Sequence, residues 1–423
     1  MASDGKSGPM WRIRGCSLTR RPVMPGLCFD PPPHQGHAMT FRNDLTVKRA
    51  VCGPQCVLFA LLFTAWAGPI IAAPTQPTPQ ALALIESLGL PASPIAVRDV
   101  PGWKVPTQIA VAYADAARLA QLQAAVPEVR LRALDRGAPL AAQLADVQAV
   151  VGVCSTEVLA AAKQLHWIQL LSVGAERCVA VPGIGERGIV LSNMQRTSAV
   201  PIAEHAIAMM MALGRGLPYY GNAQQAREWR GDADDEPAMR EVTGRTVLVV
   251  GLGGIGTEVA RRAHGLGMRV IATRNSSRDG PDFVAQVGLP DELLTLAAHA
   301  DVVVNATPLT PETTDLFDRT FFAALKPGAY FINVGRGRSV VTDDLVAALR
   351  SGRVAGAGLD VTEPEPLPKA HALWLQPNVI ITPHVAASSD AQGERYWIVV
   401  AENLRRYVAG EPLLNVVDIQ RGY

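Results

Sequence analysis

The stretch TVLVVGLGGIG, at residues 246–256, decides the fold of this 423-residue chain. Four of its first five residues are apolar, and three of these are valine, which is typical of a buried strand of a parallel sheet. The turn Gly251-Leu252-Gly253-Gly254-Ile255-Gly256 comes next, and residues 257–266 have the pattern of a helix. A G-x-G-x-x-G turn between a strand and a helix predicts a dinucleotide-binding site.

Each glycine of this turn has a separate physical task. Gly251 permits the tight turn, Gly253 leaves room for the pyrophosphate, and Gly256 lets the helix approach the strand closely. The phosphates would rest on the helix N-terminus, at Gly254 and Ile255, where free N–H groups favour anions. We therefore predict that this turn holds the pyrophosphate of a nicotinamide cofactor.

The next apolar strand, at residues 268–273, ends at Arg274. NAD enzymes place Asp or Glu there, because a carboxylate accepts a hydrogen bond from the ribose 2′-OH. An arginine instead attracts a 2′-phosphate through charge-assisted hydrogen bonds. Arg274 therefore predicts NADP. The alternative is that Arg274 only stacks on adenine and that NAD serves as well.

Short apolar strands alternate with helical patterns from about residue 108 to about residue 383. This alternation predicts an α/β fold with parallel sheets covered on both faces. A long apolar helix is expected at residues 202–213, where Met209–Met211 would serve core or dimer packing. Residues 221–242 are polar and are expected to form a loop, and a last helix is expected at residues 390–408.

Three polar residues lie at or just beyond strand ends of the second series, namely Arg336, Glu365 and His384. Ligands of such sheets bind outside the carboxyl ends of the strands. His384 can give a proton to the alkoxide that forms when a hydride reduces a 2-oxo acid. Glu365 would orient the imidazole and favour its protonated form. Arg336 can clamp the substrate carboxylate and polarise the carbonyl.

Taken singly, each of these three residues has a structural interpretation. An arginine after a strand often binds loop carbonyls, Glu-Pro-Glu-Pro is often a surface turn, and a lone histidine is often structural. Their combination at neighbouring strand ends is what favours catalysis.

The segments resemble the D-isomer-specific 2-hydroxyacid dehydrogenase family, which includes glyoxylate/hydroxypyruvate reductases and phosphoglycerate dehydrogenases. The resemblance covers about residues 80–423, and Glu365 rather than Glu363 has the family's spacing from Arg336. The matching motifs, in chain order, are Gly251–Gly256, Thr307–Thr313, Asn333–Gly337, Leu359–Val361 and Pro383-His384.

The resemblance implies further site residues and an architecture. Thr307 and Asp360 would line the nicotinamide side, and backbone N–H groups near Val173 and Gly174 would bind the substrate carboxylate. A Rossmann-type nucleotide domain at 198–385 would be inserted in a flavodoxin-like substrate domain at 76–197 plus 386–423. The family is usually homodimeric, with the helix around residues 200–213 at the interface.

The chain departs from the family pattern in the first series of strands. Where the family often has Gly-Ala-Gly-x-Asp, this sequence has Val173-Gly174-Ala175-Glu176-Arg177. This departure concerns the side chains that meet the substrate rather than the backbone contact. The identity of the acid, of the glyoxylate or hydroxypyruvate type, therefore depends on the resemblance alone.

Residues 1–75 differ from the rest of the chain. Residues 1–38 are rich in Pro, Gly and Arg and predict disorder, or sequence upstream of a true start at Met39. A positive segment, the apolar run 57–67 and Ala65-Trp66-Ala67 then form a signal-peptide pattern, which indicates export. The alternatives are a retained membrane anchor and a cytoplasmic enzyme with a mispredicted start.

The bulk composition argues against a nucleic-acid partner and against a metal site. Lys plus Arg number 39 and Asp plus Glu number 38, so there is no electrostatic reason to expect nucleic acid. Four of the six cysteines lie in residues 1–75, and only Cys154 and Cys178 lie in the part expected to fold. This distribution predicts neither a disulfide framework nor a metal site.

Two rival functions use the same scaffold. Formate dehydrogenases pair their histidine with glutamine, so Glu365 argues against that activity. A nucleotide-sensing, corepressor-like binding protein is the second rival. The intact Arg336, Glu365 and His384 argue against it, although related corepressors retain similar residues.

Overall fold

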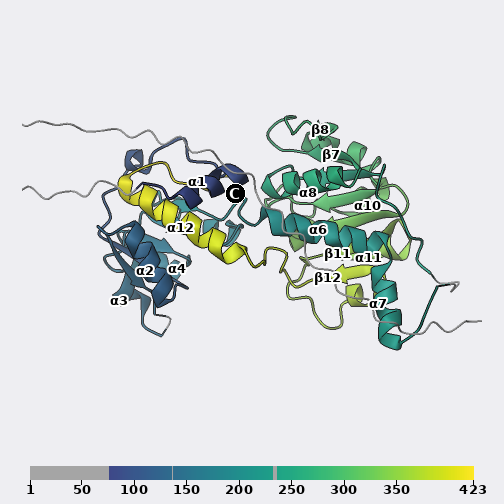
Figure 1. Ribbon diagram of the computed structural model, residues 1–423, viewed down its shortest axis with the longest axis horizontal. Coiled ribbons are helices and arrows are strands. Elements are labelled where there is room, and N and C mark those ends of the chain that lie inside the picture. Colours follow the sequence, from purple (N-terminus) through teal and green to yellow (C-terminus); the bar gives the residue numbers. More distant parts are fainter. Residues whose placement is uncertain (1–75, 136, 232–235) are drawn as a thin grey trace, which may run out of the picture. The chain divides into compact units, whose positions relative to one another are not determined.

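The computed structural model of the protein describes residues 76–135, 137–231 and 236–423. The signal-like segment predicted within residues 1–75 lies outside these described residues. The described chain forms two sheets, of five and seven strands, in which every neighbouring pair is parallel (Figure 1). The predicted α/β fold with parallel sheets is therefore confirmed.

The seven-stranded sheet has the order β12-β11-β10-β9-β6-β7-β8. From β6 the chain proceeds outward through β7 and β8, then returns to the other side of β6 and proceeds outward again through β9 to β12. The direction thus reverses between β6 and β9, the place where open α/β sheets bind ligands. The strands are β6 (Thr246–Val250), β7 (Arg269–Thr273), β8 (Gln286–Gly288), β9 (Val302–Asn305), β10 (Ala329–Asn333), β11 (Val354–Leu359) and β12 (Val379–Ile381).

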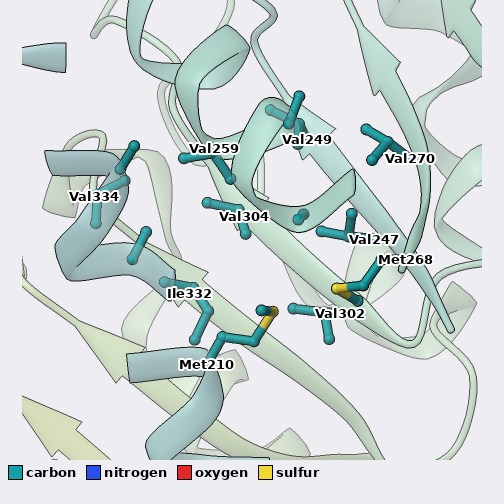
Figure 2. Packing of buried hydrophobic residues seen from close by; sticks show 14 of the residues in the cluster. Met210, Val247, Val249, Val259, Met268, Val270, Val302, Val304, Ile332 and Val334 are labelled. Atoms are coloured by element: carbon teal, nitrogen blue, oxygen red, sulfur yellow. The ribbon is translucent and has the colours of Figure 1, made fainter. Parts of the chain in front are cut away.

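Helices cover both faces of the seven-stranded sheet. Successive strand residues point to opposite faces, so Val247 packs in one hydrophobic cluster and Leu248 in the other. Met210 and Val259, from the two helices on the first face, pack with the strand valines shown in Figure 2. The helices are α6 (Ala199–Gly214) and α8 (Gly254–Gly265) on the first face, with α9 (Leu293–Ala297), α10 (Arg319–Ala324) and α11 (Thr342–Arg350) on the second.

Met209 and Met210 of α6 are buried in the first of these clusters, at 4% and 0% exposure. Of the two expectations for the methionines, core packing is thus confirmed for these two residues. The side of α6 that carries them lies on the sheet of its own chain.

The five-stranded sheet has the order β2-β1-β3-β4-β5, and the last helix of the chain packs on one of its faces. Tyr407 of that helix packs on Trp167 with a ring-centroid distance of 4.8 Å, and both side chains are fully buried. Figure 1 shows the same helix, in yellow, beside α1 and α2. The strands are β1 (Gln108–Val111), β2 (Arg130–Ala133), β3 (Ala149–Val151), β4 (Trp167–Gln169) and β5 (Val190–Ser192). The helices are α1 (Pro79–Leu88), α2 (Ala116–Ala125), α3 (Leu140–Leu144), α4 (Thr156–Ala161), α5 (Glu176–Val179) and α12 (Gln392–Ala409).

Two elements differ from the sequence-based expectation. The predicted loop at 221–242 begins inside helix α7 (Leu217–Ala226), which has Pro218 in its first turn and is followed by Arg227 in the left-handed region, with φ 61°. Strand β2 was not predicted, because it is an edge strand that pairs only with β1 and buries only Leu131. Both elements lack a strong apolar period, since little of their surface is buried.

The prediction of no disulfide framework is wrong for the two cysteines of the described region. Cys154 and Cys178 form a disulfide with their Cα atoms 5.6 Å apart, which lies within the range that the bond requires. Cys154 follows β3 and Cys178 lies in α5, after β4, and these strands are neighbours in the sheet. Their spacing of 24 residues does not reveal this proximity, because it depends on the strand order.

No helix within the described ranges is both long enough and apolar enough to span a membrane.

Candidate functional site

The predicted site residues follow six strands of the seven-stranded sheet that end at one level. Val250 pairs in register with Thr273 and Asn305, Asn305 pairs with Asn333, Asn333 with Leu359, and Leu359 with Ile381. Each of these residues is the last of its strand. One predicted site residue comes one to three positions after the end of each strand. In sheet order from β7 to β12, these residues are Arg274, Gly251, Thr307, Arg336, Asp360 and His384. Neighbouring parallel strands lie about 4.8 Å apart, so these residues form one row.

The glycine turn connects β6 to α8 with the geometry that a phosphate site needs. Gly251 has φ +95°, in the region that favours glycine. A Cβ at Gly256 would overlap the carbonyl oxygen of Gly251, so a side chain there would force α8 away from β6. The position of a Cβ at Gly253 is open, with no protein atom of the described chain within 4 Å. The Gly253 side of the α8 N-terminus is therefore open, as a phosphate site requires, while the Arg196 side chain lies against Gly254.

Arg274 directly follows β7, beside this turn. Its backbone N–H donates to the Gly288 carbonyl at 3.0 Å, and its Nη1 donates to the Asp279 carbonyl at 3.0 Å. The side chain is half-buried and held in the loop 274–279. Arg278 of the same loop instead pairs with Glu292, at 2.6 Å. Arg274 is thus held at the strand end, whereas the Arg278 guanidinium is already paired with a carboxylate.

A buried polar network holds the loop that carries Arg336. Asn305 Nδ2 donates to Asn333 Oδ1 at 2.9 Å and to Ser339 Oγ at 2.8 Å. The Arg336 carbonyl accepts from Asn333 Nδ2 at 3.0 Å and from Ser339 Oγ at 2.6 Å. The Thr307 N–H and hydroxyl both donate to Asn305 Oδ1, at 3.0 and 2.8 Å. Because every group of this network is paired, the backbone on both sides of Arg336 is fixed.

The Arg336 side chain meets Glu176, which comes from α5 beside the five-stranded sheet. Arg336 Nε donates to Glu176 Oε1 at 2.5 Å, and Nη1 donates to the Gly335 carbonyl at 2.8 Å. A Cβ on Gly174 would overlap Arg336 Nη2, so the glycine makes room for the guanidinium. Burial tends to raise the pKa of the Glu176 carboxyl, but the hydrogen bond and charge of Arg336 outweigh it and hold that pKa below its usual value.

His384 and Glu365 lie against each other at the β11 and β12 end of the row. His384 Nδ1 lies 2.9 Å from Glu365 Oε1, and the two side chains are 49% and 38% exposed. Because an ionised carboxylate only accepts hydrogen bonds, Nδ1 carries the hydrogen in this pair. The loop 337–342 touches the Glu365 segment, since Thr342 Oγ1 donates to the Glu363 carbonyl at 3.0 Å.

Asp360, which the resemblance places on the nicotinamide side, has a buried side chain that is held by the loop carrying His384. Its side chain is 4% exposed and accepts hydrogen bonds from the Thr382 hydroxyl at 2.7 Å and from the Val385 and Ala386 N–H groups at 2.9 and 3.0 Å. The carboxylate is thus turned into the loop that carries His384. Thr307 has its hydroxyl engaged by Asn305, as described above.

The structure brings Arg336 together with Gly174, and Glu365 together with His384. Val173, the neighbour of Gly174, is held by Asn193 after β5, whose Nδ2 donates to the Val173 carbonyl at 2.7 Å. Sequence reasoning missed the roles of Asn305, Asn333, Ser339 and Glu176. The two asparagines end neighbouring buried strands, and that position was the signal available in the sequence.

Comparison with known proteins places these features in one family. The sequence model described as "D-isomer specific 2-hydroxyacid dehydrogenase, NAD binding domain" matches residues 207–386. A glyoxylate/hydroxypyruvate reductase A of Serratia proteamaculans is 32% identical over 310 residues, which are 72% of this chain and 95% of the relative. A D-3-phosphoglycerate dehydrogenase of Mycobacterium leprae is 34% identical over 74% of this chain, which spans only 56% of that longer relative.

Solved structures agree with the sequence relatives. A D-isomer specific 2-hydroxyacid dehydrogenase from Xanthobacter autotrophicus, in complex with NADPH and MES, superposes with a TM-score of 0.64 at 29% identity, over 76% of this chain and 100% of that chain. An NADPH-dependent glyoxylate/hydroxypyruvate reductase from Sinorhizobium meliloti, in complex with NADP and sulfate, gives 0.64 at 28% identity, over 75% and 100%. The chain therefore belongs to the family of D-isomer specific 2-hydroxyacid dehydrogenases and is an NAD(P)-dependent oxidoreductase.

Proposed function

We propose that the chain reduces a small 2-oxo acid, of the glyoxylate or hydroxypyruvate type, to its D-2-hydroxy acid with a preference for NADPH. The observation that carries the proposal is the row of strand ends. It has an arginine at the adenosine position, an open glycine turn at the helix N-terminus, and the Glu365–His384 pair beyond Arg336.

NADPH, when bound, supplies the hydride. Arg336 binds the substrate carboxylate and draws electron density from the carbonyl oxygen. As hydride reaches the carbonyl carbon, His384 Nε2 gives its proton to the carbonyl oxygen, so the products are NADP⁺ and the 2-hydroxy acid. Glu365 keeps the imidazole oriented through Nδ1 and stabilises its positive charge before the proton leaves. Backbone N–H groups at Val173 and Gly174 provide further donors for the substrate carboxylate.

The NADP preference is supported by the place of Arg274 and by the loop around it. A carboxylate there would repel a 2′-phosphate, whereas a guanidinium forms charge-assisted hydrogen bonds with it. Relatives of similar fold are described in complex with NADPH or NADP. Thr307 and Asp360, which follow β9 and β11 in the row, are proposed to lie on the nicotinamide side.

We also propose that each sheet is the centre of a domain. Residues 76–197 and 386–423 would form the substrate domain, and residues 198–385 the nucleotide domain. The packing of α12 on the five-stranded sheet and of α6 on the seven-stranded sheet supports this division, while Ala386, at the boundary, packs with the seven-stranded sheet. A homodimer is proposed as well, and light scattering of the purified protein measures it.

One observation favours the rival function of a nucleotide-sensing binding protein without turnover. Arg336, the proposed substrate clamp, is already paired with a carboxylate of its own chain, Glu176. If that pair persisted in the presence of a 2-oxo acid, the substrate would lack its main anchor. Such a protein would bind NADPH but reduce nothing.

The deciding experiment is a panel of 2-oxo acids tested with both cofactors. The purified protein is mixed with NADPH or NADH and with glyoxylate, hydroxypyruvate, pyruvate or longer 2-oxo acids, and loss of reduced cofactor is followed. Turnover of glyoxylate or hydroxypyruvate with NADPH preferred is the expected result. Cofactor binding without oxidation of NADPH or NADH by any acid would establish the binding protein instead.

A further inference from the structure

Helix α6 lies on β11 with a register that continues to Asp360, the residue after this strand. His205, Met209 and Leu213 are spaced four residues apart and share one face of the helix. A Cβ at Gly358 would come within 2.8 Å of Met209 Cβ, and a Cβ at Gly356 within 3.1 Å of Leu213 Cδ2. The glycines of β11 thus let the helix come close. Since the two elements run in opposite directions, the next step along them places His205 opposite Asp360.

His205 reaches Asp360 directly and through Thr382. His205 Nε2 lies 2.8 Å from Thr382 Oγ1 and 3.7 Å from Asp360 Oδ1. The Thr382 hydroxyl donates to Asp360 Oδ1 at 2.7 Å. A hydroxyl has a single hydrogen, so Thr382 Oγ1 must accept the hydrogen of His205 Nε2. The direction of both hydrogen bonds, from His205 to Thr382 to Asp360, is therefore fixed.

Asp360 in turn holds the loop of His384 from both sides. Its carboxylate accepts from the Val385 and Ala386 N–H groups, and its carbonyl accepts from the His384 N–H at 2.8 Å. His384 has φ 55°, a left-handed conformation that a residue with a side chain adopts only when its surroundings hold it there. A buried carboxylate needs hydrogen-bond donors. The Thr382 hydroxyl is one of the three donors that this loop gives to the Asp360 carboxylate, beside the Val385 and Ala386 N–H groups.

We propose that His205 is a positioning residue for the reaction and acts on His384 through Thr382 and Asp360. Its Nε2–H keeps the Thr382 hydroxyl turned toward Asp360, and Asp360 keeps the loop in the one conformation that sets the His384 ring against Glu365. The inference rests on the proposed function, because only turnover makes the orientation of His384 matter. His205 itself touches neither cofactor nor substrate in this scheme.

The test compares two amide side chains that differ in reach. In His205→Gln the amide nitrogen lies about where Nε2 lies, whereas in His205→Asn it stops one bond short. We expect His205→Asn to lower kcat about tenfold while the KM values for NADPH and the 2-oxo acid stay within about twofold, and His205→Gln to recover most of kcat. His299→Asn, at an exposed histidine beyond α9, is the control and should leave kcat unchanged.

A double-mutant cycle separates positioning from general damage. If His205 acts only through His384, then His205→Asn has no further effect on kcat in a His384→Ala background. Equal losses in His205→Asn and His205→Gln, or a further loss in the His384→Ala background, would overturn the proposal. Thr382→Val, which removes the relaying hydroxyl, replaces His205→Asn if that variant does not fold.

Amide hydrogen exchange tests the same inference without turnover. The Val385 and Ala386 N–H groups should exchange faster in His205→Asn than in the native chain or in His205→Gln, because Asp360 would hold them less firmly. Exchange that changes as expected in a protein that reduces no 2-oxo acid would reject the proposed function and leave the loop contact standing. If the native chain reduces a 2-oxo acid, and His205→Asn changes neither kcat nor the exchange of these N–H groups, the positioning role alone is rejected.

Discussion

The strand ends of the two sheets differ in how they assemble polar groups. In the seven-stranded sheet, six strands end at one level, and each is followed by a residue that the sequence motifs singled out. In the five-stranded sheet, the polar group that reaches the site is Glu176, and the loop that carries it is tied by the Cys154–Cys178 disulfide. The first arrangement carries the residues that the sequence motifs predicted. The second carries two contacts, the Arg336–Glu176 pair and the disulfide, that the sequence did not predict.

The comparison predicts unequal effects of substitution in the two sheets. Changes at the strand ends of the seven-stranded sheet should remove chemistry or cofactor choice. Changes around the five-stranded sheet should adjust substrate affinity or stability.

The largest effect is expected at the β12 end, where His384→Ala removes the proposed proton donor. We expect kcat to fall by about two orders of magnitude or more, the usual scale of general acid catalysis, while the affinity for NADPH stays the same. Steady-state kinetics and a fluorescence titration with NADPH measure the two quantities. A variant that keeps its full rate would remove His384 from the mechanism.

The next effect concerns cofactor choice at the β7 end. Arg274→Asp should lower the ratio of kcat/KM for NADPH over NADH by roughly ten- to a hundredfold, the range of a charge-assisted hydrogen bond. Arg278→Ala is the matched control, because Arg278 belongs to the same loop but pairs with Glu292. An unchanged ratio in Arg274→Asp would refute the 2′-phosphate assignment.

A smaller effect is expected where the two sheets' residues meet, at Glu176. Glu176→Gln removes the charge that competes with the substrate carboxylate for Arg336, so the KM for the 2-oxo acid should fall severalfold. The pKa of Glu176 lies below its usual value of about 4.3. The Glu176 carboxylate therefore stays charged through mildly acidic pH. The difference in KM between Glu176→Gln and the native chain should narrow only when the pH falls below the usual pKa of a glutamate.

The KM for the 2-oxo acid, measured from neutral pH downward for both proteins, checks this prediction. Glu186→Gln, at an exposed carboxylate farther along the same connection, is the control. A higher KM in Glu176→Gln would show that Glu176 assists substrate binding rather than competing with it.

The smallest effect concerns stability within the five-stranded sheet, at His166. Burial lowers the pKa of this histidine, which is 9% exposed, and the nearby Pro101 backbone opposes the shift only in part. The unfolded chain thus binds a proton more readily, near pH 6.5. The stability that depends on a neutral His166 is present above that pH and is lost as the pH falls, with a slope of at most about 1.4 kcal/mol per pH unit.

Denaturant unfolding at several pH values measures this term. His166→Phe should lose less stability than the native chain as the pH falls below 6.5, and the exposed control His299→Gln should follow the native chain. A parallel decline in His166→Phe and the native chain would exclude His166 as the source.

The sequence predicted the features that lie within one segment or follow directly from parallel strand ends. The glycine turn, the strands that flank it and the α/β class could be predicted because each depends on local spacing and apolar pattern. The Asn305–Asn333–Ser339 network could not be specified, since the hydrogen-bond direction of each amide depends on the packed neighbours.

Contacts between segments that are far apart in the sequence could not be predicted either, because they too depend on the packed structure. The partners Arg336 and Glu176 are separated by 160 residues, and the link from His205 to Thr382 spans 177. Neither contact leaves a trace in local pattern, and edge strand β2 buries too little to show one. The disulfide was missed because only the strand order makes the two cysteines neighbours.

The state of the Cys154–Cys178 bond, oxidised or reduced, also reports the redox conditions of the compartment in which the protein is found. Disulfides persist in oxidising compartments, and cytosolic thiols are kept reduced. Protein taken from its native source and alkylated before any reductant is added would carry labels at both cysteines if it came from a reducing compartment, and at neither if it came from an oxidising one. One mass measurement of the peptides that contain these residues would thus report the redox history of the folded molecule, independently of any measurement of its activity.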